Sequence, residues 1–313
     1  MIDHLEVHNY KMFERLRLDG LGRINLIVGK NNVGKTSLLE IGYLATSPYK
    51  LHALDQILKL RHANLDEGIL TILKKFGPAT ASALLRHFEI SFPGGVFQIT
   101  DIPKNILIHG NNDYETKLTE QRAVLNKLPG AAFVPSSGID PWELDRYWDI
   151  LDLTGNKGLV TEALRLALPE IEAFGLVRAS SGLREPHVRL RGQKEFEVIH
   201  SLGEGMHRIS GLSLGLLFAQ DGYLFIDEIE NGLHYTLHEQ ICDFLFAAAT
   251  QLNVQVFLTT HSLDFTRAFA RSANKTSEVG RLYRLDKTFG PIEAIPYTEE
   301  EMYIAAEQNI EVR

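Results

Sequence analysis

The fold is decided by a stretch near the N-terminus, which reads Ile24-Asn25-Leu26-Ile27-Val28-Gly29-Lys30-Asn31-Asn32-Val33-Gly34-Lys35-Thr36-Ser37-Leu38-Leu39. Its apolar beginning predicts a buried parallel strand, and the residues after Thr36 predict the start of a helix. Between strand and helix stands the pattern G-x-x-x-x-G-K-T, which is typical of a phosphate-binding loop. The stretch therefore predicts an α/β protein that binds a nucleoside triphosphate.

The residue types of this loop match the chemistry of phosphate binding. Gly29 and Gly34 let the backbone bend so that successive N–H groups face one point at the positive end of a helix. Lys35 reaches the outer phosphates and the Thr36 hydroxyl can ligate Mg²⁺. We expect ATP and Mg²⁺ as cofactors, with the nucleotide held by Gly29, Asn31, Asn32, Gly34, Lys35, Thr36 and Ser37.

Composition limits the class of protein. The 313 residues suffice for one large domain or two modest ones, and the net charge of -8 excludes a generally basic nucleic-acid coat but not a local basic groove. The single cysteine, Cys242, excludes a disulfide framework and fits a reducing compartment. The N-terminus does not resemble a signal peptide and no apolar run approaches membrane-spanning length, so we expect a cytoplasmic protein that is not associated with a membrane.

A second acidic strand completes the predicted catalytic site. The four residues 223–226 are apolar or aromatic and lead into Asp227 and Glu228. A parallel strand delivers its last residues to the same sheet edge as the phosphate loop. We expect Asp227 to hold Mg²⁺ and Glu228 to polarise the attacking water. The next predicted strand, 252–258, is followed by His261, which we expect to contact the γ-phosphate or that water.

The segment 200–206 opens an apolar helix that runs toward Ala219. Ser201 and Gly203 at the start of this helix make a second phosphate-binding end. One chain does not need two such ends for one γ-phosphate, but the second end is useful if it meets the nucleotide of another copy. The sequence therefore predicts a homodimer that forms around ATP.

Four motifs occur in the order of a known family, namely Gly29–Thr36, Ser201–Glu204, Ile226–Glu228 and Thr260–His261. This order resembles the Walker A, signature, Walker B and switch-histidine motifs of ABC-type ATPase heads. The stretch Asp227–His234 is similar to the OLD-like ATPases in the branch that also contains the SMC and RecF proteins. The resemblance covers about 1–47 and 195–270, and it implies that Ser201, Gly203 and Glu204 contact the ATP of a partner copy.

The resemblance also implies a fold. We expect a mainly parallel sheet flanked by helices, with antiparallel strands at the N-terminus, formed by residues 1–47 and 195–313. Residues 48–194 are then an insertion lobe, part helical and part antiparallel, and within it 140–174 has helical spacing. This lobe is too short and interrupted for the coiled coil of SMC proteins, and no Toprim nuclease motif is recognisable. Ser136 or Ser137 stands where the family has a glutamine.

Three readings of the function remain. The first is an ATPase that couples its cycle to a partner, such as a separate nuclease or effector, in DNA maintenance or defence against phage or plasmids. The second is a transporter ATPase subunit, which the stretch after Asp227 disfavours. The third is a slow ATP-gated switch or scaffold. DNA is a further possible partner, since the strand with Arg189 and Arg191 presents a basic face.

Overall fold

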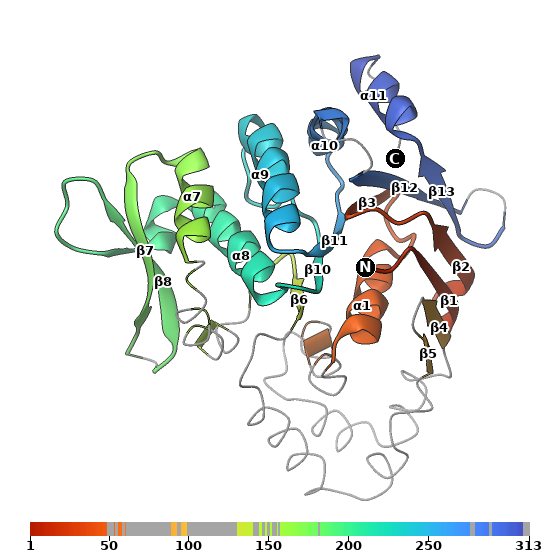
Figure 1. Ribbon diagram of the computed structural model, residues 1–313, viewed down its shortest axis with the longest axis horizontal. Coiled ribbons are helices and arrows are strands. Elements are labelled where there is room, and N and C mark those ends of the chain that lie inside the picture. The colour runs from red at the N-terminus through yellow and green to blue at the C-terminus, as the bar shows by residue number, and fades with distance from the viewer. Residues whose placement is uncertain are drawn as a thin grey trace, which may run out of the picture.

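The computed structural model describes residues 1–48, 89–92, 95–98, 130–139, 157–180, 182–275, 279–287 and 290–308, with single positions between 53 and 155. The core is a six-stranded sheet in the order β13-β12-β3-β11-β10-β6 (Figure 1). Its strands are β3 (Ile24–Gly29), β6 (Ala131–Val134), β10 (Tyr223–Ile226), β11 (Gln255–Thr259), β12 (Gly280–Asp286) and β13 (Glu293–Tyr297). Neighbouring strands are parallel except β12 and β13.

The central sheet is covered on both faces. Every residue of β3 is buried, as expected for a parallel strand between two layers of helices. Ile24, Leu26 and Val28 pack into a cluster with α8 (Glu204–Phe218), α9 (His238–Gln251) and α10 (Leu263–Lys275). Ile27 packs on the opposite face with α1 (Lys35–Thr46). The predicted mixed, mainly parallel sheet flanked by helices is therefore confirmed.

The predicted N-terminal antiparallel strands are also confirmed. A second sheet has the order β2-β1-β4-β5, with β1 (His4–Tyr10), β2 (Phe13–Asp19), β4 (Glu89–Phe92) and β5 (Gly95–Gln98). Buried residues of β1 and β2 share a hydrophobic cluster with α1, which fixes the helix between the two sheets. A third sheet contains β7 (Ile171–Arg178), β8 (Arg184–Leu190) and β9 (Glu197–Val198) beside α7 (Gly158–Ala167).

The strand pairings do not follow the boundary expected at residue 48 between the core and the insertion lobe. β6 lies inside the range 48–194, yet it pairs with β10 in the central sheet, and β4 pairs with β1 in the N-terminal sheet. The helix expected over 140–174 is also wrong at its end, because α7 stops at Ala167 and β7 begins at Ile171. Pro169 explains the stop, since the residue before a proline favours an extended backbone and Leu168 has φ -141 and ψ 92.

Three further elements complete the described chain. A 3-10 helix, η2 (Ile199–Leu202), precedes α8, and a second one, η3 (Tyr235–Leu237), precedes α9. The chain continues after β13 into α11 (Glu299–Glu307), which begins with the capping box of Thr298 and Glu301. No helix in the described part of the chain is both long and apolar enough to cross a membrane.

Candidate active site

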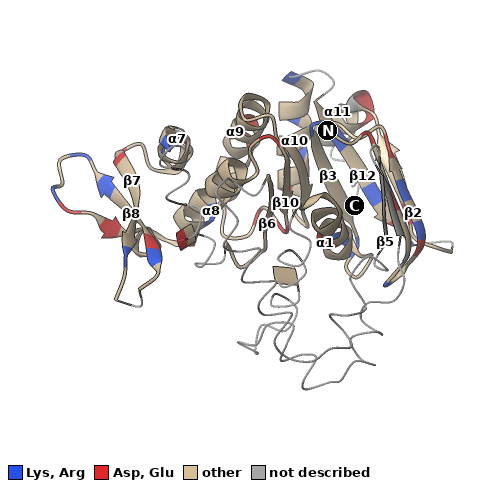
Figure 2. Cartoon of the chain, turned by 60° about the horizontal axis from the view of Figure 1, so that its bottom comes forward, with Lys and Arg blue, Asp and Glu red and all other residues tan. Residues whose placement is uncertain are grey.

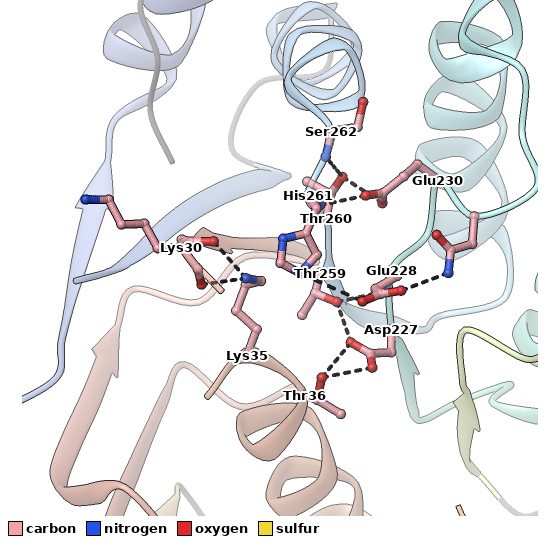
Figure 3. A network of polar contacts seen from close by, with 12 residues as sticks. Lys30, Lys35, Thr36, Asp227, Glu228, Glu230, Thr259, Thr260, His261 and Ser262 are labelled. Carbon is pink, nitrogen blue, oxygen red and sulfur yellow. Dashed lines mark hydrogen bonds and ion pairs between the residues drawn. The ribbon is translucent and has the colours of Figure 1, made fainter. Parts of the chain in front are cut away.

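The ends of β3, β10 and β11 meet at one edge of the central sheet, and the loop from Gly29 to Thr36 lies over it (Figure 3). Gly29 and Gly34 have φ of +145° and +93°, a region that side chains rarely adopt. A Cβ on Gly34 would lie 2.5 Å from Cζ of Phe13, and a Cβ on Gly29 would lie 2.6 Å from the carbonyl of Leu285. Both glycines are therefore required by the tight packing of the loop as well as by its curvature.

Lys35 is held inside this loop. Its ammonium donates hydrogen bonds to the carbonyls of Gly29 at 2.7 Å and Lys30 at 3.0 Å. The side chain is buried, and burial lowers its pKa, against the attraction of Asp227 and the other carboxylates nearby. A desolvated cation inside a loop of this sequence is suited to the outer phosphates of a nucleotide.

Asp227 is the centre of a hydrogen-bonded group at the end of β10. Thr36 Oγ1 donates to its Oδ2 at 2.9 Å, and Thr259 Oγ1 donates to its Oδ1 at 2.6 Å. Burial raises the pKa of Asp227, and the two hydroxyl donors oppose that shift. A carboxylate and a hydroxyl side by side form the oxygen donor set that Mg²⁺ prefers, so Thr36 and Asp227 fit the metal-ligand role expected of them.

Glu228 follows directly and takes an unusual backbone conformation. Its φ is +45°, which costs a non-glycine residue free energy and re-aims the side chain at the cleft. The Glu228 amide donates to Thr259 Oγ1 at 2.9 Å, and Asn231 Nδ2 donates to the carboxylate at 2.8 Å. Nε2 of His261 lies 3.8 Å from the other carboxylate oxygen, and both side chains are more than one third exposed.

His261 is positioned by Glu230. The His261 amide donates to Glu230 Oε1 at 2.6 Å, and Thr260 Oγ1 donates to Glu230 Oε2 at 2.7 Å (Figure 3). One carboxylate thus ties the loop after β10 to the loop after β11. The result is an open cleft of about 720 Å³ lined by Met12, Asn31, Asn32, Gly34, Lys35, Thr36, Ser37, Glu228, Glu230, Asn231 and His261.

Several members of this site were not expected from the sequence. Thr259 and Asn231 contact Glu228, Glu230 contacts the His261 amide, and Met12 reaches the cleft from the β1–β2 turn. A signal existed for Thr259, because it ends the strand that pairs with the acidic strand. Glu230 and Asn231 stand in the stretch after Asp227 that carries the family resemblance, but no role follows from their order alone.

The signature residues lie away from this cleft. In the part of the chain that the structure describes, neither Ser201, Gly203 nor Glu204 belongs to the cleft lining. α8 begins at Glu204 with Gly203 as its N-cap at φ +101°, and a Cβ on Gly203 would meet open space. Ser201 does not cap α8, because its hydroxyl donates to the carbonyl of Val198, the residue before η2, at 2.7 Å.

Arg208 connects the signature helix to the catalytic strand and was also missed. This buried side chain of α8 donates to the carbonyls of Pro135 at 2.5 Å, Asp227 at 2.7 Å and Glu228 at 2.9 Å. Burial lowers its pKa to about 10, so the guanidinium stays charged at neutral pH. Ser136 and Ser137, beside this contact, are exposed.

The basic strand predicted to face DNA is β8, and its charges have acidic neighbours. Arg184 lies 3.3 Å from Asp145, and Arg189 lies 3.4 Å from Glu172. Figure 2 shows both signs of charge on the hairpin of β7 and β8. Val188 is buried and its neighbours His187 and Arg189 are half-buried, but Leu190 is half-buried as well and the strand ends before Arg191.

A phosphate loop, an acidic strand end and a histidine at one sheet edge define a P-loop nucleoside triphosphatase.

Comparison with known proteins agrees with this class of protein. Residues 149–266 match the family described as "AAA domain, putative AbiEii toxin, Type IV TA system". The fold is similar to an Smc head bound to the C-winged helix domain of ScpA, with a TM-score of 0.54 and 12% identity over 96% of this chain and 98% of that one. It is also similar to the Smc head with an extended coiled coil bound to the C-terminal domain of ScpA from Pyrococcus furiosus, with a TM-score of 0.50 and 11% identity over 99% of both chains.

A relative found by sequence similarity also supports a nucleoside triphosphatase. The chain is 21% identical over 325 residues to an "ATP/GTP phosphatase" of Helicobacter pylori, covering 85% of this chain and 86% of that one. It is 36% identical over 81 residues to an uncharacterized protein of Methanocaldococcus jannaschii, covering 26% of this chain and 71% of that one, so it belongs to the same family as that protein. The chain is an ATPase with the fold of SMC head domains, and its residues 149–266 are similar to the AAA-domain family.

Proposed function

We propose that this ATPase works as a homodimer with two shared ATP sites and couples hydrolysis to a partner. Within one site, Lys35 and the backbone of the phosphate loop bind the triphosphate. Thr36 and Asp227 would hold Mg²⁺, which neutralises phosphate charge when it is bound. Glu228 accepts the proton of the attacking water, and His261 orients the same water or the γ-phosphate.

The placement of the signature residues carries the dimer proposal. The start of α8 is open to approach at Gly203, but it does not line the cleft of its own chain. The N–H groups of a helix start favour an anion, and the γ-phosphate of a second copy supplies one. Each site would then be completed by Ser201, Gly203 and Glu204 of the other protomer.

The proposal of a partner protein is based on the comparisons. The matched family description names a toxin of a toxin–antitoxin system, and the similar Smc heads bind the protein ScpA. We propose an effector protein, such as a nuclease, that recognises the ATP-bound dimer in DNA maintenance or in defence. Affinity capture on the Glu228→Gln protein with ATP, against Lys35→Ala as the unloaded control, should enrich this effector.

Light scattering of Glu228→Gln tests the dimer. This variant keeps the shape of the site but loses the base, so with ATP and Mg²⁺ its mass should double, and with ADP it should stay monomeric. Glu239→Gln, on the exposed face of α9, is a matched control and should not accumulate as dimer under turnover. A Glu228→Gln protein that binds ATP and remains monomeric would overturn the proposal.

The two alternative functions predict different experimental results. A transporter subunit should co-purify with a membrane protein. A slow switch should bind ATP stoichiometrically but show almost no turnover per bound nucleotide in the steady state.

A further inference from the structure

β7 is the edge strand of the third sheet, and most of its outer edge is open. The sheet has the order β7-β8-β9, so only one side of β7 is paired. Its first residues are protected by a shift in register between Ile171 and Ala173 and by Arg165, which donates to the carbonyls of Ile171 and Glu172. Among the described residues, no backbone group from Ala173 to Arg178 has a hydrogen bond outside the pairing with β8. An open edge is a template for pairing with another strand.

The pairing with β8 shows which backbone groups point outward. The Ala179 amide donates to the Leu183 carbonyl at 2.8 Å, so this opposed pair is hydrogen-bonded. Hydrogen-bonded and non-hydrogen-bonded pairs alternate along antiparallel strands. Leu176 therefore forms a non-hydrogen-bonded pair with Pro186, which agrees with the lack of an N–H group in proline. The N–H and C=O groups of Leu176, and by the same alternation those of Phe174, point to the open edge.

The side chains along this edge are apolar, and a charge stands at each end. Residues 173–177 read Ala-Phe-Gly-Leu-Val, and Val177 is 43% exposed. Glu172 precedes this run and Arg178 follows it, with side chains that are 51% and 60% exposed. The strand contains no lysine and no proline, the residues with which natural sheets block their edges.

A second copy of the same strand matches this edge. When two copies of β7 run antiparallel about a twofold axis at Gly175, Phe174 lies opposite Leu176 of the partner subunit. The outward N–H and C=O groups of these two residues can then pair. Val177 lies opposite Ala173 of the partner subunit, so apolar side chains meet apolar side chains. The edge is therefore complementary to itself.

The charges agree with the same register. Glu172 lies at the end of the pairing where Arg178 of the partner subunit lies, so opposite charges meet at both ends. We propose that β7 is an interface between two copies of this chain, formed by antiparallel pairing of residues 173–177. The hairpin of β7 and β8 forms one end of the molecule, away from β3 and the phosphate loop (Figure 1). This interface therefore goes beyond the proposed function and does not require nucleotide.

The interface is a weak one. A pairing of five residues is smaller than the interface of a stable complex, so dilute protein without ATP still scatters light as a monomer. Each dimer that forms around ATP would carry two such edges, one from each protomer. At high protein concentration, β7 then links these dimers into larger assemblies.

Disulfide trapping tests the interface and its register. The axis at Gly175 places the two Cα atoms of this residue about 4.5 Å apart, within the range of a disulfide. A Cβ on Gly175 would meet no atom within 4 Å, so Gly175→Cys fits the strand, and the native Cys242 is buried. With oxidised glutathione, the Gly175→Cys protein should form a covalent dimer at least about tenfold faster than the Val177→Cys protein.

Val177→Cys is the matched control on the same strand. Its position is exposed, but in this register the two copies of it lie about 13 Å apart, too far for a disulfide. A mixture of Ala173→Cys and Val177→Cys proteins should form the mixed covalent dimer, because these positions oppose each other. Equal trapping of Gly175→Cys and Val177→Cys, trapping of Val177→Cys alone, or no trapping of either would overturn the proposal.

The charged ends provide a second test. In the Gly175→Cys protein, Glu172→Arg should slow trapping several-fold, because two cations then meet at each end. Adding Arg178→Glu should restore the rate. Slow trapping in both variants, with the midpoint of thermal unfolding unchanged, would overturn the register.

The Lys35→Ala background separates this interface from the ATP-dependent dimer. Trapping of Gly175→Cys should be equally fast in that background and without nucleotide. Trapping that requires ATP and an intact Lys35 would assign the contact to the ATP-dependent dimer and overturn the separate interface. A Glu228→Gln protein that stays monomeric with ATP while Gly175→Cys is trapped would overturn the proposed dimer alone.

Discussion

Glu228 and Asp227 are adjacent in sequence but lie in different environments. Asp227 is buried and receives hydroxyl hydrogen bonds, whereas Glu228 faces the cleft at a positive φ beside His261. The left-handed backbone at Glu228 allows two consecutive side chains to point in different directions at the end of β10. Thr259 supports both, since its hydroxyl donates to Asp227 and accepts from the Glu228 amide.

Glu228→Gln should lower the rate of ATP hydrolysis by at least about 100-fold, because the water loses its proton acceptor. ATP affinity should remain within a few-fold of wild type, since the amide keeps the size and the Asn231 contact of the carboxylate. A phosphate-release assay and a binding titration check the two expectations. Hydrolysis near the wild-type rate would assign the base elsewhere.

Asp227→Asn should stabilise the protein at pH 7 while abolishing hydrolysis. The pKa of Asp227 is raised above its usual value by burial, so the folded chain holds this proton more tightly than the unfolded chain does. Ionisation therefore costs stability as the pH rises through the raised pKa. We expect a midpoint of thermal unfolding a few degrees above wild type at pH 7.

The stabilisation by Asp227→Asn should shrink as the pH falls toward 3.8, the ordinary pKa of an aspartate, because the wild-type carboxyl is then protonated. Thermal unfolding without nucleotide or metal, between pH 4 and pH 8, measures it. A gain that is constant with pH would mean that charge burial is not its cause. Asp221→Asn, on an exposed turn, is a suitable control.

At the scale of elements, α8 is the link between the signature and the catalytic strand. Arg208 reaches from the helix to carbonyls at the end of β10 and in the loop after β6. Because the donors are charged and the contacts are buried, α8 cannot shift without breaking them or moving the strand end. This gives the start of α8, near Gly203, a physical connection to Asp227 and Glu228.

Arg208→Ala should destabilise the protein by about 3 kcal/mol, since buried carbonyls lose their donors. It should lower kcat more than it weakens ATP binding, because Glu228 is displaced while the phosphate loop is not in contact with Arg208. Chemical denaturation and steady-state kinetics measure these effects. Arg208→Lys keeps the positive charge but loses the planar set of N–H donors, so it should show a partial loss of both stability and kcat.

The sequence predicts elements well where one strand or loop carries its own pattern. The loop from Gly29 to Thr36, the strand before Asp227 and the hairpin of β1 and β2 all form where their spacing places them. Prediction from the sequence fails where the two strands that pair are distant in the chain. The pairing of β6 with β10 joins residues about ninety positions apart, and short apolar strands carry no sign of which neighbour they choose.

The same limit applies to the site. Glu230 reaches His261 across two loops, and Arg208 reaches carbonyls after β6 and after β10. These contacts depend on how loops meet in space, which periodicity does not encode. Ser201 illustrates the converse, because a serine next to a helix start suggests a cap although its hydroxyl bonds within the preceding turn.

At the scale of the whole molecule, the account depends on a site divided between two copies. One protomer would supply Lys35, Asp227 and Glu228, and the other would supply Ser201, Gly203 and Glu204. The Ser201→Arg protein should therefore bind ATP normally through its own phosphate loop. It should fail to dimerise, because the arginine side chain occupies the position where the γ-phosphate of the partner copy would bind. Sedimentation of Glu228→Gln/Ser201→Arg with ATP should give a monomer.

The most direct test mixes two inactive variants. Lys35→Ala lacks a phosphate site and Ser201→Arg lacks the completing helix end, so each alone should hydrolyse ATP at background rate. In a mixed dimer, one site combines the intact Lys35 of one protomer with the intact Ser201 of the other. The account predicts activity for the mixture several-fold above the sum of the two separate activities. A mixture that only equals this sum would contradict the shared site.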